Sequence, residues 1–96
     1  MPHCIVEYSA NLEADLSPRK LIRRIYDAIV ATGVYPLGGV RVRAARRDVY
    51  IVADGDPENA FVAVLIRMGQ GRDEATRRRV SQEVLAALAD ETSDSF

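Results

Sequence analysis

Pro2 is the residue of this sequence with the most unusual chemistry. If Met1 is removed, Pro2 becomes a free secondary amine at the start of an apolar segment, a base that no internal residue can supply. A prolyl amine in water is largely protonated at neutral pH, but burial and nearby cations disfavour the charged form and lower its pKa. The simpler interpretation is that Pro2 only follows the start codon, and a retained Met1 would convert its amine into an amide.

Arg41, Arg43 and Arg72 are the cations that could accompany such a base, because each lies at the end or edge of a predicted strand. Such cations would help to lower the pKa of Pro2, and a guanidinium group is also able to bind a carboxylate through two parallel hydrogen bonds. The structural alternative for Arg41 is an ion pair at a strand edge, with Glu7 or Asp48 as its partner.

Two glycines support a binding role for Arg72. Gly69 and Gly71 precede it, and glycines let the backbone come close to a ligand. The helix expected to follow would offer free backbone amides to an anion.

Metal and disulfide chemistry are not expected. One histidine, His3, and one cysteine, Cys4, cannot build a zinc site from protein ligands alone, and a single cysteine forms no internal disulfide. We expect Cys4 in the core, assign neither residue a role in catalysis, and expect no cofactor.

The composition is that of one small soluble domain, which we expect to span residues 1–96. Apolar residues make up 48% of the chain and charged residues 28%. No apolar run approaches the length of a membrane span, so the cytoplasm is the expected location. The balance of 13 basic and 14 acidic residues argues against nucleic-acid binding despite basic clusters at 41–47 and 77–79. We expect the 77–79 cluster to be a solvated helix face.

The first half of the sequence predicts a strand followed by a helix. Residues 2–8 have the composition of a strand, and Ser17 and Pro18 suit the N-cap and first position of a helix. Gly33 suits the position after its last turn. Between these limits, apolar residues recur at helical spacing: Leu21, Ile22, Ile25, Ala28 and Ile29.

The second half predicts further strands and a second helix. Residues 40–45 and 49–53 resemble two short strands or one interrupted strand, and the apolar segment 60–66 is expected at the centre of the sheet. The second helix should begin near Glu74, and a polar tail should follow it over residues 90–96.

The order of elements repeats, which predicts an α+β fold. Two β-α-β units side by side would form a mixed sheet with both helices on one face. The other sheet face would need cover, and this predicts an oligomer because monomers tolerate large exposed apolar faces poorly.

The sequence resembles the tautomerase superfamily and, within it, the 5-carboxymethyl-2-hydroxymuconate isomerase family. The resemblance covers most of residues 2–90 in order. It rests on the segments PHCIVE (2–7), ATGVYPLGGVRVR (31–43), ADG (53–55), AFV (60–62) and GQGR (69–72).

The resemblance implies a cofactor-free isomerase of aromatic catabolism that acts as a homotrimer, with pockets at subunit boundaries. It implies that Pro2 is the base and that Arg41 and Arg72 bind the carboxylates of an unsaturated di- or tricarboxylate and polarise its 2-oxo group; we add Arg43 as a substrate-binding residue. Family members continue with another strand after the second helix, so the second β-α-β unit is expected to be incomplete here.

Other functions remain open at this point. The same scaffold could carry a different proline-dependent tautomerisation or a decarboxylation, since one fold supports many chemistries. A binding module that kept the fold and the oligomer without the chemistry is the non-enzymatic alternative. Nucleic-acid binding through the arginine clusters ranks last.

Overall fold

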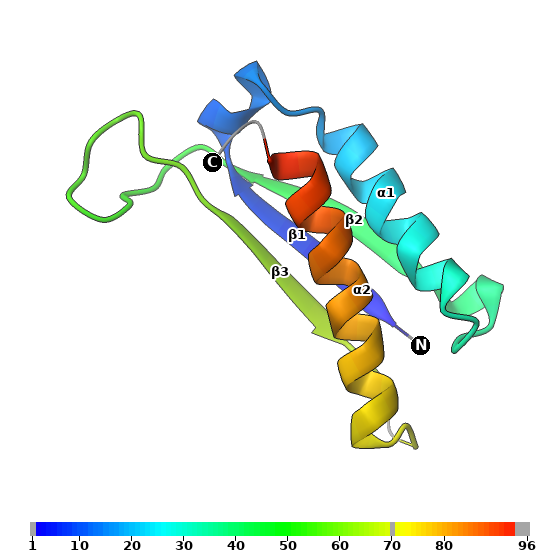
Figure 1. Cartoon of the computed structure of the whole chain (residues 1–96). Helices are drawn as coiled ribbons and strands as arrows, with labels where there is room; N and C mark the ends of the chain where they lie inside the picture. The colour runs from blue at the N-terminus through cyan, green and yellow to red at the C-terminus, as the bar shows by residue number, and fades with distance from the viewer. Residues whose placement is uncertain (1, 70, 94–96) are drawn as a thin grey trace.

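The structure, a computed structural model, describes residues 2–69 and 71–93. It has an α+β fold with a three-stranded mixed sheet and two helices that lie side by side on one face of it (Figure 1). The elements in chain order are β1 (His3–Ser9), the short 3-10 helix η1 (Ala10–Ala14), α1 (Pro18–Ala31), the 3-10 turn η2 (Leu37–Gly39), β2 (Arg41–Arg47), β3 (Val62–Arg67) and α2 (Glu74–Thr92).

Strand β1 is the centre of the sheet. It pairs in parallel with β2 and antiparallel with β3, and the register sets His3 opposite both Arg41 of β2 and Arg67 of β3. Alternate β1 side chains therefore point toward the helices. These are Cys4, Val6 and Tyr8, all buried in the core.

The expectation that the apolar segment 60–66 is central in the sheet was wrong. This segment becomes β3, which lies at an edge of the sheet among the described residues. Its side chains alternate between half-buried and exposed, because helices cover only one face of the sheet. The apolar composition of a strand does not fix its place in the sheet, and here β1 takes the central position.

Helix α1 begins and ends where its sequence predicts. The Ser17 side chain accepts a hydrogen bond from the Lys20 backbone N–H at 3.4 Å, and Pro18 is the first helical residue. Gly33 has a φ of +68°, the left-handed conformation that ends a helix. The predicted apolar face packs against α2 and β2.

Helix α2 extends further than expected. Asp73 is its N-cap and accepts from the Thr76 backbone N–H at 2.7 Å. The helix continues to Thr92, whose buried side chain donates to the Leu88 carbonyl at 2.7 Å. The polar tail predicted over 90–96 therefore begins as helix, and residues 94–96 of that tail lie outside the described residues.

A strand over residues 49–53 was predicted, and this prediction was wrong. Residues 48–61 form a loop that projects from the end of the sheet (Figure 1). The Asn59 side chain donates to the Val52 carbonyl at 3.0 Å and to Asp54 at 2.7 Å, which fixes the loop internally. No strand of the described residues pairs with it, and Val49 and Ile51 are 96% and 87% exposed.

The sheet face opposite the helices is open. It carries half-buried or exposed side chains from all three strands: His3, Ile5, Glu7, Arg41, Arg43, Ala45, Ala63 and Leu65. No helix among residues 2–69 and 71–93 has the length and apolarity to cross a membrane.

Candidate active site at the N-terminal end of the central strand

Pro2 lies at the start of β1 and is fully buried. Its carbonyl accepts a hydrogen bond from the Arg41 backbone N–H at 3.0 Å, which fixes Pro2 to the first residue of β2. Because side chains alternate along a strand, the Pro2 ring lies on the helix-covered side, as Cys4 does. This burial is one of the conditions that a prolyl amine with a lowered pKa needs.

The Arg41 side chain turns back toward the η2 turn. Its Nη1 donates to the carbonyls of Gly38 at 2.7 Å and Val40 at 3.2 Å, and the residue is exposed. The ion-pair alternative for Arg41 was wrong, because other arginines occupy both carboxylates. Arg47 pairs with Glu7 at 3.0 Å, and Arg46 pairs with Asp48 at 2.8 Å.

Arg43 lies two residues along β2, on the open face of the sheet. Its Nη1 lies 3.2 Å from His3 Nδ1, so His3 acts as the hydrogen-bond acceptor when Nδ1 carries no proton. Arg43 also opposes the effect of burial on the Cys4 thiol, but burial dominates and raises the pKa of Cys4 to about 11. Cys4 is therefore a core residue, as expected, with a thiol that stays protonated at neutral pH.

Arg72 lies on the other side of the sheet from Arg43 and immediately precedes Asp73, the N-cap of α2. Its Nη2 donates to the Val34 carbonyl at 3.3 Å, and its guanidinium carbon lies 5.3 Å from the centre of the Tyr35 ring. Gly71, with a φ of +100°, supplies the left-handed backbone that leads into Arg72.

The structure gathers the four predicted residues at one end of the sheet but on two faces. Arg41 and Arg43 extend from the open face, while Pro2 and Arg72 lie on the helix-covered side. A substrate that contacts Pro2 and all three arginines therefore needs a surface that a single chain does not enclose. This arrangement fits the expectation of a pocket at a subunit boundary, which remains a prediction.

The 77–79 cluster only partly matches the expected solvated face. Arg78 forms an ion pair with Glu74 at 3.0 Å, as expected for residues one helical turn apart. Arg79 instead reaches across to α1, where its Nη2 donates to the Thr32 carbonyl at 3.0 Å.

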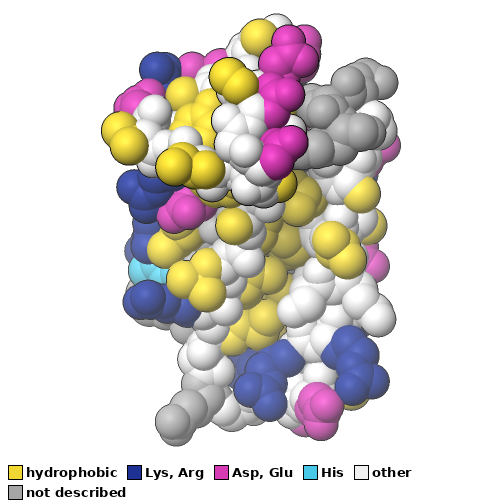
Figure 2. Space-filling model, turned by 90° about the vertical axis from the view of Figure 1, so that its left-hand side faces the viewer, with side chains coloured by type: hydrophobic (Ala, Val, Ile, Leu, Met, Phe, Trp, Pro, Cys, Tyr) yellow, Lys and Arg dark blue, Asp and Glu magenta, His cyan; other side chains and the backbone are white. Residues whose placement is uncertain are grey.

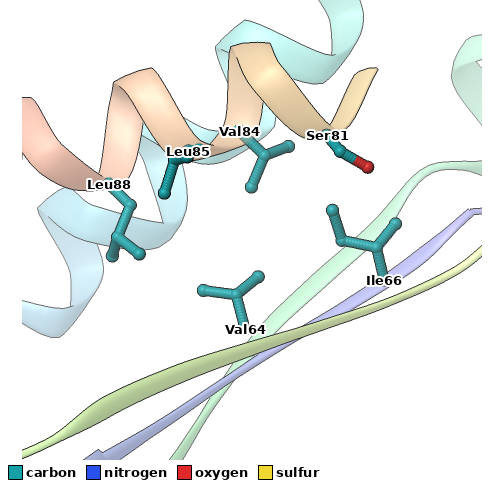
Figure 3. Close-up of a pocket in the computed structure, with 6 residues that line it drawn as sticks. All are labelled: Val64, Ile66, Ser81, Val84, Leu85 and Leu88. Carbon is teal, nitrogen blue, oxygen red and sulfur yellow. The ribbon is translucent and has the colours of Figure 1, made fainter. Parts of the chain in front are cut away.

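A separate apolar groove runs between β3 and α2. Its volume is about 310 Å³, and Figure 3 shows its lining side chains converging from the two elements. Figure 2 shows hydrophobic side chains along the middle of this face, with Lys and Arg side chains at the end where α2 begins. Its lining includes Val64, Ile66, Val84 and Leu88 and excludes the predicted catalytic residues.

Tyr35 is the residue of this region that the sequence analysis missed. Its hydroxyl oxygen is buried and has no hydrogen-bond partner among the described residues. Nothing in the local sequence marks it, because a buried hydroxyl without a partner is a property of the tertiary structure. Among residues 2–69 and 71–93, no cluster of three or more His, Cys, Asp or Glu side chains suits a metal ion.

The fold defines the class of protein. Solved structures of the tautomerase fold superpose on this chain at low identity; one, a fused symmetric trimer of 4-OT, has a TM-score of 0.73 at 17% identity and shows the fold alone. The superposition covers 93% of this chain and 72% of the 4-OT chain. The chain is thus a tautomerase-fold protein.

The family model of 5-carboxymethyl-2-hydroxymuconate isomerase matches residues 2–96, and the chain belongs to this family. A curated relative, the 5-carboxymethyl-2-hydroxymuconate Delta-isomerase of Escherichia coli, is 33% identical over 82 residues, or 85% of this chain. The match covers 65% of that relative, slightly less than two thirds of its length.

Two solved structures of this family are similar over almost the whole chain. A 5-carboxymethyl-2-hydroxymuconate delta-isomerase has a TM-score of 0.90 at 31% identity, covering 98% of this chain and 72% of that chain. The corresponding isomerase from Deinococcus radiodurans R1 has a TM-score of 0.89 at 32% identity, covering 99% of this chain and 72% of that chain.

Proposed function

We propose that this protein is an isomerase that converts a 2-hydroxymuconate-type di- or tricarboxylate from its dienol to its keto form. The observation that carries the proposal is the family match from residue 2 onward, in which Pro2 immediately precedes the central strand β1. Relatives at 31% to 33% identity are named as isomerases of this substrate type. We assign the role of the base to Pro2 because of its chemistry and its position.

In the proposed reaction the Pro2 amine accepts the proton of the substrate 2-hydroxyl group. The electrons of that O–H bond form the C=O bond, the double bonds shift along the chain, and the protonated amine returns the proton to the carbon at the far end of the conjugated system. Atoms and charge balance without a cofactor. Burial of Pro2 favours the uncharged amine that the first step needs.

The three arginines have distinct proposed roles. Arg41 and Arg72 bind substrate carboxylates and stabilise the negative charge that develops on the 2-oxygen, and Arg43 contributes a further contact to the substrate. None of them acts as an acid, because a guanidinium group keeps its proton near neutral pH. Their fixed positive charge matches a substrate with two or three carboxylates.

We propose that the active form is a homotrimer. The open sheet face, the positions of the arginines on two faces, and the exposed Val49 and Ile51 of the projecting loop all support an assembly of several chains. We also propose that residues 1–96 form one domain. The proposed location is the cytoplasm, and the proposed pathway is the catabolism of aromatic compounds.

The experiment is a turnover assay with 5-carboxymethyl-2-hydroxymuconate, followed by ultraviolet absorbance because the conjugation changes. The sample is checked by intact mass for removal of Met1. We expect turnover by the wild-type protein and its loss in Pro2→Ala. If the Pro2→Ala variant keeps wild-type kinetics, Pro2 is not the base; if only related 2-oxo acids react, the alternative chemistries on this scaffold apply.

A further inference from the structure

The hydroxyl group of Tyr35 lacks a partner that its burial requires. Its oxygen is inaccessible to solvent and forms no hydrogen bond with any of the described residues. Removing a hydroxyl from water without replacing its hydrogen bonds costs free energy, so such groups are rare in folded proteins. Tyr35 lies in the connection between α1 and η2 and packs against the hydrophobic core.

The surroundings of Tyr35 are positively charged. Arg72 stacks over the ring, with 5.3 Å between the guanidinium carbon and the ring centre. Arg72 and Arg77 both act to lower the pKa of Tyr35, although burial has the larger effect and raises it.

The nearest arginine has hydrogen-bonding capacity to spare. Among the described residues, Arg72 donates one hydrogen bond, to the Val34 carbonyl, and a guanidinium group has five N–H donors. The carboxylate closest in sequence, Asp73, is occupied as the N-cap of α2. An O–H donor without an acceptor therefore lies beside a cation with unused donors.

We propose that Tyr35 and Arg72 together bind one carboxylate group of the substrate. The Tyr35 hydroxyl donates to one carboxylate oxygen, and the Arg72 guanidinium donates to the other. This inference rests on the proposed function, which supplies a substrate with two or three carboxylates, and it adds Tyr35 as a binding residue. The hydroxyl oxygen is buried in the free protein, so the side chains that cover it must move aside to admit the carboxylate; exposed side chains change rotamer within nanoseconds.

If the Tyr35 hydroxyl had a permanent hydrogen-bond partner, removal of the hydroxyl would affect stability and substrate affinity differently. An ordered water, or a group of a second copy of the chain, would satisfy the hydroxyl in the free protein. Loss of the hydroxyl would then lower the stability of the unliganded protein without changing substrate affinity. In our account the free protein gains nothing from the hydroxyl, because no partner is present until the carboxylate arrives.

The test compares Tyr35→Phe with a matched control, Tyr26→Phe. Tyr26 also has an arginine over its ring, Arg23 at 5.4 Å, but it lies on the side of α1 away from Arg72. The probe is muconate, which has two carboxylates but lacks the reactive 2-hydroxyl group. Calorimetric titration gives its affinity, and thermal unfolding without ligand gives the stability of each variant.

We expect Tyr35→Phe to weaken muconate binding by about tenfold, because a hydrogen bond to a charged group is lost. We expect its unfolding temperature without ligand to be equal to or above that of the wild type, and Tyr26→Phe to bind as the wild type does. Unchanged affinity in Tyr35→Phe, or no binding of muconate by the wild type, would overturn the proposal. Muconate binding needs no Pro2 amine, so an absence of turnover would count against the proposed reaction and not against this site.

Discussion

The backbone N–H of Arg41 donates to the carbonyl of Pro2 at 3.0 Å, so the first residue of β2 holds the residue that precedes β1. This contact begins the parallel ladder between the two strands. It fixes Pro2 to the sheet and keeps the ring buried instead of leaving the residue on a mobile terminus. Positioning of this kind is what a catalytic base needs, because misplacement of a reacting group by about 1 Å costs on the order of 100-fold in rate.

Replacing Arg72 with alanine should lower kcat/KM by about 100-fold or more. The variant removes a guanidinium group that we place next to the developing charge of the substrate. Steady-state kinetics on 5-carboxymethyl-2-hydroxymuconate measures the effect. The matched control is Arg78→Ala, whose side chain pairs with Glu74 on an exposed helix face. If Arg72→Ala and Arg78→Ala have the same kcat/KM, Arg72 does not belong to the active site.

Replacing Arg41 with alanine should lower kcat/KM by about 10- to 100-fold, the effect of losing a hydrogen bond to a charged group. Because Arg41 is exposed and donates only to nearby carbonyls, we expect the unfolding temperature to change little. Arg47→Ala is the control on the same face of the same strand, where Arg47 pairs with Glu7. A loss of activity in Arg47→Ala as large as in Arg41→Ala would show that general charge on β2 matters, and not Arg41 itself.

The assembly is expected to depend on the projecting loop. Val49→Asp and Ile51→Asp should leave a single chain folded, because both side chains are almost fully exposed in it. In a trimer that buries them, the new carboxylate would lose its hydration and weaken the interface. Light scattering after size-exclusion chromatography should show trimers for the wild type and smaller species for both variants.

Lys20→Asp is the control for this experiment. Lys20 is exposed in the first turn of α1, where an acidic residue is tolerated. It should remain trimeric. A wild-type protein that is monomeric at all concentrations, or aspartate variants that stay trimeric, would contradict the proposed interface.

Stability should fall as the pH rises from about 9 to about 11. Burial raises the pKa of Cys4 from 9.0 to about 11, so the unfolded chain loses this proton before the folded chain does. A group with a raised pKa stabilises the fold below its unfolded pKa, and this contribution is lost as the pH rises through the folded value. Denaturant titrations of wild type and Cys4→Ala at pH 8 to 11 measure it.

The Cys4→Ala variant should be less stable at pH 8 because the substitution leaves a small cavity, but its stability should fall less steeply with pH. Tyr8, whose pKa is raised to about 12 by burial and by its hydrogen bond to Glu13, adds a decline at higher pH in both proteins. Identical slopes for the two proteins between pH 9 and 11 would show that Cys4 does not titrate differently in the folded state.

The sequence predicted the helices well because their signals are local. The cap at Ser17 and the spacing of apolar residues depend on neighbours within a few positions, and both helices start where expected. The prediction of a strand at 49–53 was wrong because strand formation does not depend on local signals alone. Its composition suits a strand, but a strand also needs a partner, and within the described chain the Asn59 side chain takes the Val52 carbonyl instead.

The candidate site was predictable in its residue types and not in its contacts. Pro2 and the arginines stand out by chemistry and position in the sequence. Arg41 and Arg43 share one face because side chains alternate along β2, but the position of Arg72 on the other side depends on the tertiary structure, which single-sequence patterns do not fix. Tyr35 could not be identified from sequence, because its missing hydrogen bond depends on what α2 places around it.

The most direct test of the central claim is the ionisation of the Pro2 amine itself. Protein labelled with nitrogen-15 at proline can be titrated by NMR, with the Pro2 signal identified by its absence in Pro2→Ala. We predict a titrating amine whose pKa lies well below that of a prolyl amine in a short peptide, so that it is uncharged at neutral pH. An amine with the ordinary pKa, or an amide nitrogen that does not titrate, would contradict the assignment of Pro2 as the catalytic base.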